Sequence, residues 1–334
     1  MTTDELTRLA TLYYVDGLTQ EDLSKQFSLS RAKIGRLLKR AQEEGIVEIR
    51  VKHHPSDTRG LERELITRFG IDRAILSITH KDQDKQREML AGLVASHLDR
   101  VLANDMIIAV GMGRNINAIS QHSISSIQRA STFVCATGGF YRGGESMNAD
   151  HICRRLAARL GGESETLYAP ALVNAPDVRQ ALLENDAVKQ TLGKARRAHV
   201  ALIGVGDINE DSNMVRTGWF SPEEIAELRR GGAVGDLMGY CFIDLNGKPA
   251  VTSVRDRVIG LSMEDLKHIP NVIAVASEST KTTAVLGALR TGVINTLATT
   301  EAIAQAVVAL EQATRTQSSP SLPKDDETAS WPFL

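Results

Sequence analysis

The feature that most constrains the fold is a recurring unit of an apolar segment, a turn and an amphipathic helical segment. Glycine or small polar residues form most of the turns. Near-continuous apolar strands that alternate with helices are typical of a doubly wound, mostly parallel α/β sheet. We predict strands at 71–78, 106–110, 132–136, 165–169, 200–205, 240–245, 272–276 and 293–297. We predict helices near 58–69, 84–102, 115–128, 147–160, 175–194, 222–230, 280–290 and 300–313.

One turn interrupts the parallel pattern. Asn246-Gly247 follows the apolar segment 240–245, and this dipeptide is typical of a tight hairpin. We therefore predict an antiparallel segment over 249–254 at one edge of the sheet.

The first 54 residues have a different pattern, that of three short helices. The first has an apolar side, and Thr19–Gly45 predicts two more helices joined by a turn at Ser28-Leu29. Thr19 and Asp22 have the spacing of a capping box, and Ser30 can cap the third helix. The β-branched segment 46–51 predicts a strand that forms a small wing. Together these features predict a three-helix, winged helix-turn-helix domain.

The third helix has the composition of a DNA-recognition helix. Residues 31–40 carry five positive charges and no negative one, whereas the apolar stripe lies on the opposite side. Arginine on such a face can bind guanine edges in the major groove. A protein-interaction module with a solvated basic face is the alternative. We predict DNA contacts from Thr19, Gln20, Ser30, Arg31, Lys33, Arg36, Lys39 and Arg40.

Charge limits how tightly one such domain can bind DNA. The whole chain has a net charge of -2, and in residues 1–53 the basic side chains exceed the acidic ones by only one. We therefore expect a single copy to bind DNA weakly, and we expect a homo-oligomer that binds DNA through several helix-turn-helix domains (residues 1–54, called the heads below).

Composition also indicates the compartment and the absence of a metal. Three widely spaced cysteines fit a reducing environment without disulfides. The His53-His54 pair and the His151/Cys153 pair lack further ligands, so we predict no metal site. Because the chain has no secretory signal and no membrane-spanning apolar run, we expect a soluble, cytoplasmic protein with no membrane partner. The domains are predicted as 1–54, 55–313 and a disordered tail, 314–334, rich in Pro, Ser and mixed charge.

Glycine-rich or small polar clusters follow several predicted strands, at 111–115, 137–139, 204–207 and 277–281. Ligands bind at this edge of an open parallel sheet, where glycines allow close approach to backbone N–H groups. Asp236 could accept sugar hydroxyl groups, and Lys281 could bind a phosphate or hydroxyl. Gly111-Met112-Gly113 lacks the third glycine of a dinucleotide site, and no phosphate-binding lysine loop is present, so no cofactor is predicted.

Several motifs together resemble the SorC family of sugar-responsive bacterial transcription regulators, over roughly residues 5–313. They are Leu18-Thr19-Gln20-Glu21, Ser30-Arg31, Leu37-Leu38, and the segments 231–236, 258–261 and 286–295. The resemblance implies an effector domain similar in fold to phosphosugar isomerases and deaminases but acting as a sensor. It also implies a tetramer whose binding to operator DNA responds to a sugar, polyol or sugar phosphate. By position, the effector-binding residues would be Gly111, Gly113, Arg114, Thr137, Gly138, Gly139, Asp236 and Lys281.

One departure from the family bears on the effector. Many relatives have Gly-Gly where this chain has Ser277-Glu278. A carboxylate at a phosphate cradle would repel phosphate, which favours a free sugar or polyol.

We predict a DNA-binding regulator of a carbohydrate or polyol catabolic operon, and no enzyme. The alternative is a sugar-phosphate isomerase or deaminase with an appended helical module. That enzyme would need a general acid and base. Asp207, Asp236 and Glu278 are available, but the sequence shows no acid–base pair.

Overall fold

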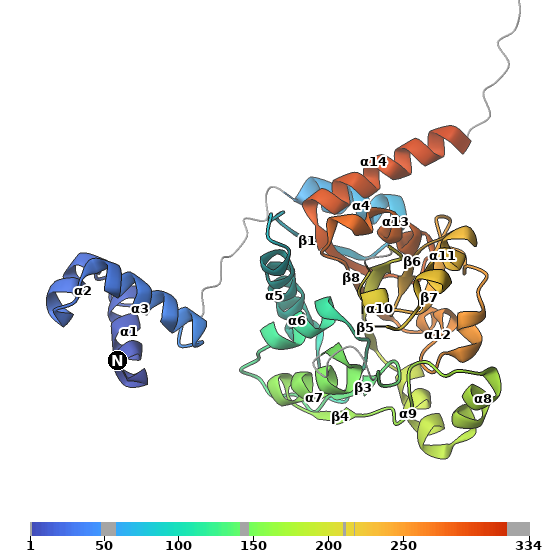
Figure 1. The fold of residues 1–334 in the computed structure, drawn as a ribbon, viewed down its shortest axis with the longest axis horizontal. Coiled ribbons are helices and arrows are strands. Elements are labelled where there is room, and N and C mark those ends of the chain that lie inside the picture. The colour runs from blue at the N-terminus through green and yellow to red at the C-terminus, as the bar shows by residue number, and fades with distance from the viewer. Residues whose placement is uncertain (1, 48–57, 141–146, 210–211, 217, 319–334) are drawn as a thin grey trace, which may run out of the picture. The chain divides into compact units, whose positions relative to one another are not determined.

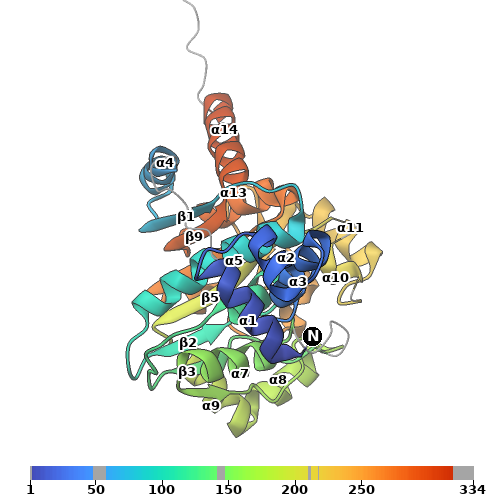
Figure 2. The same cartoon turned by 90° about the vertical axis from the view of Figure 1, so that its left-hand side faces the viewer.

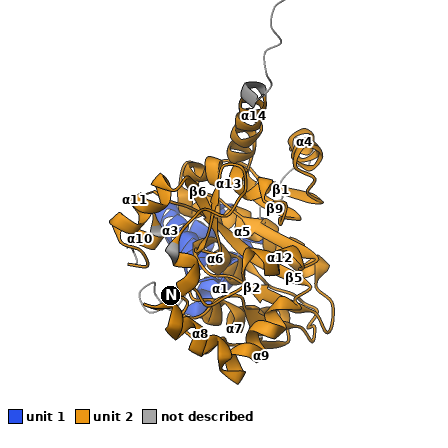
Figure 3. Cartoon of the chain, turned by 90° about the vertical axis from the view of Figure 1, so that its right-hand side faces the viewer, with its two compact units in different colours: residues 1–54 blue, residues 55–334 orange. Residues whose placement is uncertain are grey.

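A computed structural model describes residues 2–47, 58–140, 147–209, 212–216 and 218–318. The chain divides into two compact units, residues 1–54 and 55–334, which Figure 3 shows in different colours.

The first unit contains three helices: α1 (Thr3–Tyr14), α2 (Gln20–Phe27) and α3 (Arg31–Glu43) (Figure 1). Each begins at a hydroxyl cap, provided by Thr2, Thr19 and Ser30, as predicted for the second and third helices. Ser28 adopts a left-handed conformation (φ 52°) and turns the chain between α2 and α3. Their apolar faces form one small core of buried residues: Leu6, Leu9, Ala10, Leu23, Ile34, Leu38 and Ala41. The predicted wing strand lies mostly outside the described residues.

The second unit is built on a parallel sheet, as predicted. Seven strands lie in the order β1 (Arg73–Ser77), β9 (Thr296–Thr300), β8 (Asn271–Val275), β5 (Val200–Asp207), β2 (Ile107–Val110), β3 (Thr132–Cys135) and β4 (Glu163–Glu165). Every neighbouring pair in this order is parallel.

Helices cover both faces of the sheet, which places an apolar core on each side. Within β2, Ile108 and Val110 belong to one core, whereas Ala109 belongs to the other. The first core is covered by α5 (Gln83–Val101), α6 (Arg114–His122), α7 (Ala149–Leu160) and α9 (Asp186–Arg196). The second is covered by α4 (Arg59–Phe69), α11 (Pro222–Arg230), α13 (Thr282–Arg290) and α14 (Glu301–Ser318). Figure 2 shows α14 near the β1–β9 edge of the sheet and α7 near β3.

An antiparallel extension branches from β5 in a place that was not predicted. The last residues of β5 pair with β6 (Ala233–Leu237), and β6 pairs with β7 (Cys241–Asp244). Met238 and Gly239 turn the chain between β6 and β7, both with positive φ. The hairpin turn predicted at Asn246-Gly247 is also present: Gly247 has a positive φ, Pro249 makes an antiparallel bridge to Ile243, and Ala250 donates to the Phe242 carbonyl at 2.9 Å. The antiparallel segment predicted over 249–254 is shorter than expected, because a 3-10 helix begins at Ser253.

Some predicted boundaries were also wrong. The strand predicted at 165–169 ends at Glu165, because residues 169–172 leave the sheet and pair with residues near Gly139 and Ile259. The helix predicted at 115–128 ends at His122. The helix predicted at 175–194 is two helices, α8 (Pro176–Glu184) and α9, because Asn185 caps α9 with its side chain. The strand predicted at 293–297 begins at Thr296.

Helix α14 also continues to Ser318, past the predicted start of the tail at residue 314. Glu311 accounts for this extension. Its buried carboxylate forms ion pairs with Arg290 of α13 at 2.6 Å and with Arg315 at 2.5 Å, which holds the last turns against the domain. Residues 319–334 of the predicted tail lie outside the described residues.

Candidate functional site

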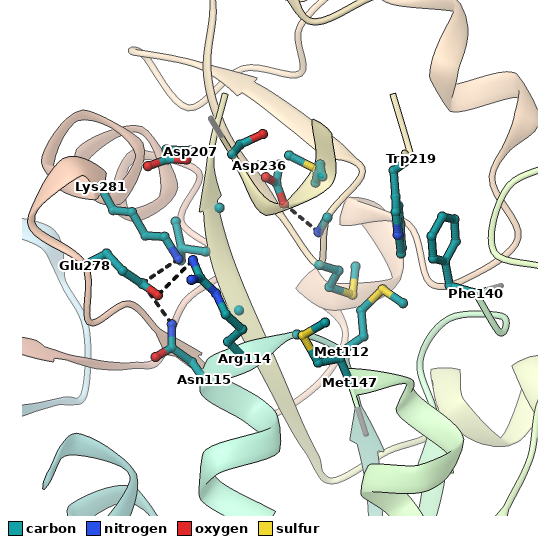
Figure 4. Close-up of a pocket in the computed structure, with 18 of the residues that line it drawn as sticks. Met112, Arg114, Asn115, Phe140, Met147, Asp207, Trp219, Asp236, Glu278 and Lys281 are labelled. Carbon is teal, nitrogen blue, oxygen red and sulfur yellow. Dashed lines mark hydrogen bonds and ion pairs between the residues drawn. The ribbon is translucent and has the colours of Figure 1, made fainter. Parts of the chain in front are cut away.

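A pocket opens at the carboxyl ends of β2, β5 and β8, at the edge where the sequence predicted a ligand (Figure 4). It contains about 840 Å³ of space, which includes solvent at its open mouth. Residues 112–115 follow β2, residues 204–207 end β5, and Glu278 and Lys281 follow β8. Asp236 of β6 and Met238 and Gly239 of the β6–β7 turn also line the pocket.

One wall of the pocket is aromatic and apolar. The rings of Phe140 and Trp219 lie with centroids 4.0 Å apart and planes at 31°. Asn148 fixes the Phe140 backbone, since its amide oxygen accepts from the Phe140 N–H at 2.7 Å and its amide nitrogen donates to the Phe140 carbonyl at 2.9 Å. Four methionines complete this wall: Met112, Met147, Met214 and Met238. Such a surface suits the C–H face of a sugar ring better than a strongly charged molecule.

Asp236 provides a buried carboxylate with unused hydrogen-bonding capacity. Its Oδ1 accepts from the Gly239 N–H at 2.5 Å, but among the described residues its buried Oδ2 has no partner. Burial raises the pKa of Asp236 to about 7, against the opposing effects of the Gly239 N–H and the charge of Lys281. Gly206, opposite Asp236 on β5, makes room for the carboxylate, because a Cβ there would lie 2.1 Å from Oδ2.

Glu278 lies at the other end of the pocket, inside a cluster of donors. Its Oε2 is 2.8 Å from Lys281 Nζ and 3.2 Å from Asn115 Nδ2. Its Oε1 is 3.3 Å from Arg87 Nη2 and 3.4 Å from Arg114 Nη2. Burial alone would raise the pKa of Glu278, but the neighbouring cations, Lys281 above all, hold it well below its usual range.

The predicted effector residues divide into two groups. Gly113, Arg114, Asp236 and Lys281 line the pocket, whereas Gly111, Thr137, Gly138 and Gly139 are not among its lining residues. Gly111 donates to the Leu202 carbonyl within the sheet, and Gly138 has a packing role, because a Cβ there would lie 2.5 Å from the Ala169 carbonyl oxygen. Thr137 and Gly139 form bridges to Gly260 and Pro170.

Sequence reasoning missed the aromatic and methionine wall. Phe140 and Trp219 are far apart in the chain and have no diagnostic spacing. A lone aromatic residue in a loop is more often packing than binding, so neither could have been selected from the sequence.

In the first unit, the basic face of α3 is exposed as predicted. Arg31, Lys33 and Arg36 have exposed side chains, and no described carboxylate lies within ion-pair distance of them. Lys39 pairs with Glu43 at 3.5 Å and Arg40 with Glu44 at 2.6 Å. Thr19 and Ser30 cap their helices, and the Gln20 side chain lies against Gly35 of α3. Three cations are thus fully available, and two are partly neutralised.

The described residues contain no group of three or more His, Cys, Asp or Glu side chains arranged to hold a metal. In the same part of the chain, no helix combines the length and apolar character of a membrane span.

Comparison with known proteins identifies the family. Residues 53–309 match the family described as "Putative sugar-binding domain". The transcriptional regulator LsrR of Klebsiella pneumoniae is 30% identical over 310 residues, which is 91% of this chain and 92% of that protein. The chain belongs to the SorC family of sugar-binding transcriptional regulators.

Two solved structures agree with the fold. The structure described as "Putative Sugar-Binding Domain of Transcriptional Repressor from Vibrio fischeri" is 48% identical, and the match covers 76% of this chain and 99% of that one with a TM-score of 0.71. The full-length sorbitol operon regulator SorC of Klebsiella pneumoniae is 26% identical, covers 92% of this chain and 99% of its own, and has a TM-score of 0.73.

Proposed function

We propose that this protein is a sugar-responsive regulator that binds operator DNA through α3 and a small carbohydrate through the pocket of the α/β unit. It controls a carbohydrate or polyol catabolic operon and acts in the cytoplasm, where the operator lies. Family membership supports the general role, and the pocket and the basic helix support the assignment of residues.

The observation that carries the sugar assignment is that one pocket contains both the buried carboxylate of Asp236 and the aromatic wall. A sugar or polyol has hydroxyl groups that donate to a carboxylate, and a C–H face that packs on aromatic rings. Asp236 Oδ2, which has no partner within the described part of the chain, can accept such a hydroxyl, and Phe140 and Trp219 can pack on the carbon skeleton. Lys281 and Arg114 supply donors for the ligand's oxygen atoms.

The head is assigned the output role. We assign base contacts in a major groove to Arg31, Lys33 and Arg36. We assign contacts to the DNA phosphates to Thr19, Gln20, Ser30, Lys39 and Arg40. Because one head has almost no net charge, operator binding requires several heads, so we propose a homo-oligomer, a tetramer by family analogy, on a palindromic operator.

An enzyme is the alternative, and the pKa of Asp236, about 7, is the one observation that favours it. A general acid–base mechanism needs a second titratable partner. Glu278 is held ionised by its cations, and Asp207 accepts a hydrogen bond from Thr280 at 2.5 Å. We therefore propose sensing without turnover. Conversion of any pentose or hexose phosphate by the pure protein would overturn this choice.

A thermal-shift screen over sugars, polyols and their phosphates tests the pocket assignment. A ligand at 100 times its Kd stabilises the folded state by about 2.7 kcal/mol. We expect at least one carbohydrate to raise the Tm of the wild-type chain but not that of Asp236→Ala. A compound that stabilises both proteins equally would place the site elsewhere.

A further inference from the structure

We infer that the Glu278 carboxylate occupies a ready-made phosphate cradle, so that the pocket accepts uncharged sugars or polyols and excludes phosphorylated ones. This inference rests on the proposed function of the pocket and specifies its ligand class. In this inference a sugar phosphate is excluded because the Glu278 carboxylate already fills the phosphate position, and not only because the carboxylate repels the phosphate charge.

Donors surround both oxygen atoms of the Glu278 carboxylate. Each carboxylate oxygen has two donors: Lys281 and Asn115 for Oε2, and Arg87 and Arg114 for Oε1. Three cations and an amide converge on one small anion, which is the donor set that a phosphate group requires. The Glu278 side chain is only 6% exposed, so the anion is part of the interior. The cradle therefore has no free place for a second anion.

Other contacts hold the donors of the cradle in position. Ser277 donates to Asn115 Oδ1 at 2.7 Å, which turns the Asn115 amide nitrogen toward Glu278. Arg87 is also held by Asp84 at 2.6 Å. Arg114 and Asn115 open α6, and the N-terminus of this helix favours a negative charge. Removal of the carboxylate would leave these donors in place around an empty site.

The charge of the pocket wall also disfavours a phosphorylated ligand. Arg114 and Lys281 are its cations, and Asp207, Asp236 and Glu278 are its acidic residues. Cations therefore do not outnumber carboxylates, even when Asp236 is protonated. A sugar phosphate would bring a charge of about -2 into a wall with no positive excess, whereas a neutral polyol would not.

The test compares Glu278→Ala with Glu278→Gln in the full-length chain. Both variants remove the charge, but only alanine vacates the volume. Inorganic phosphate is titrated at constant ionic strength, and binding is followed by calorimetry and thermal shift. We expect Glu278→Ala to bind phosphate at least about tenfold more tightly than the wild type, a difference of one charge-assisted hydrogen bond. Glu278→Gln should show no gain. Adding Lys281→Ala to Glu278→Ala should abolish the gain.

The wild-type chain supplies an independent test that requires no variant to fold. Its Tm is measured with matched pairs of probes, sorbitol and sorbitol 6-phosphate, then ribose and ribose 5-phosphate. Stronger stabilisation by a phosphorylated member would overturn the inference. The inference would also be overturned if the wild type and Glu278→Ala bound phosphate with the same affinity, or if neither protein bound it. An equal gain in Glu278→Gln would favour repulsion over occupancy. Phosphate capture by Glu278→Ala alone, with no sugar bound by the wild type, would support the cradle but contradict the proposed sugar pocket.

Discussion

Gly206 and Asp236 lie opposite each other across the antiparallel β5–β6 pair, and the Asp236 carboxylate occupies the space that a side chain on Gly206 would fill. A Cβ on Gly206 would lie 2.1 Å from Asp236 Oδ2 and 2.9 Å from its Cγ. The backbone of Gly206 is not in the left-handed region, so glycine is required here by space rather than by conformation. The branch of β6 from β5 thus places a buried carboxylate in the pocket.

We predict that Gly206→Ala disrupts the pocket. The added methyl group must displace the Asp236 carboxylate, and such overpacking costs about 1–3 kcal/mol of unfolding free energy. Carbohydrate-induced stabilisation should be lost at the same time. Gly204→Ala on the same strand is the control for stability, because its Cβ would meet only the Met112 carbonyl at an ordinary 3.7 Å. Denaturant unfolding of both variants would measure the difference, and equal costs would contradict the prediction.

Asp236 should make stability depend on pH. Its pKa rises from 3.8 to about 7 on folding, so between these values the folded state holds a proton that the unfolded state lacks. The free energy of unfolding should therefore fall as pH rises from about 4 to 7, by on the order of 4 kcal/mol, and this contribution should then level off. In Asp236→Asn this fall should be absent, so the variant should exceed the wild type in Tm at pH 8 but not at pH 4. Parallel Tm profiles for the two proteins would show that Asp236 ionises normally.

The sequence predicted the parts of the molecule that depend on periodicity and local rules. Apolar runs located the strands of the parallel sheet, and hydroxyl residues located the starts of α2 and α3. The β6–β7 pair was missed because Ala233–Leu237, with its glycine and its aspartate, does not resemble a strand. The pairing of β6 depends on a distant strand, β5, where Gly206 lies opposite Asp236.

The site was predicted only in part for a similar reason. Asp236 and Lys281 could be selected because a charge beside an apolar strand is conspicuous. Thr137, Gly138 and Gly139 looked equally suitable, but this segment packs against 169–170 and 259–260. Lys281 is three residues from Glu278, but the other two cations, Arg87 and Arg114, come from distant segments of the chain, so their approach to Glu278 is visible only in the fold.

Trp219 should report ligand binding directly. The chain has two tryptophans, Trp219 and Trp331, so Trp331→Phe leaves a single fluorophore in the pocket wall. A bound sugar should change its emission, and the titration should give the same Kd as calorimetry. Trp219→Ala should weaken binding by about 0.5–1.5 kcal/mol, the scale of an aromatic packing contact. Unchanged affinity in Trp219→Ala would remove this wall from the site.

The basic residues of α3 should differ in their effects on DNA binding. Arg36 is exposed without an ion pair, so Arg36→Ala should cost about 1–3 kcal/mol on the operator and relax its sequence preference. Lys39→Ala should weaken all DNA alike and lower the salt slope, because a phosphate contact carries no sequence information. Arg8→Ala, on the exposed side of α1, serves as the charge-matched control. Anisotropy titrations at two salt concentrations would separate these effects, and an Arg36→Ala variant indistinguishable from Arg8→Ala would refute the assignment of α3.

The central claim is that a sugar in the pocket changes the affinity of the head for DNA. The operator is first selected from a random-sequence DNA pool, and its Kd for the full-length chain is then measured with and without a sugar that saturates the Trp219 signal. We predict a change of roughly 5–150-fold, the usual range of allosteric coupling, in the wild type and none in Gly206→Ala, which should still bind the operator. An operator Kd that stays the same when the pocket is saturated would contradict the account.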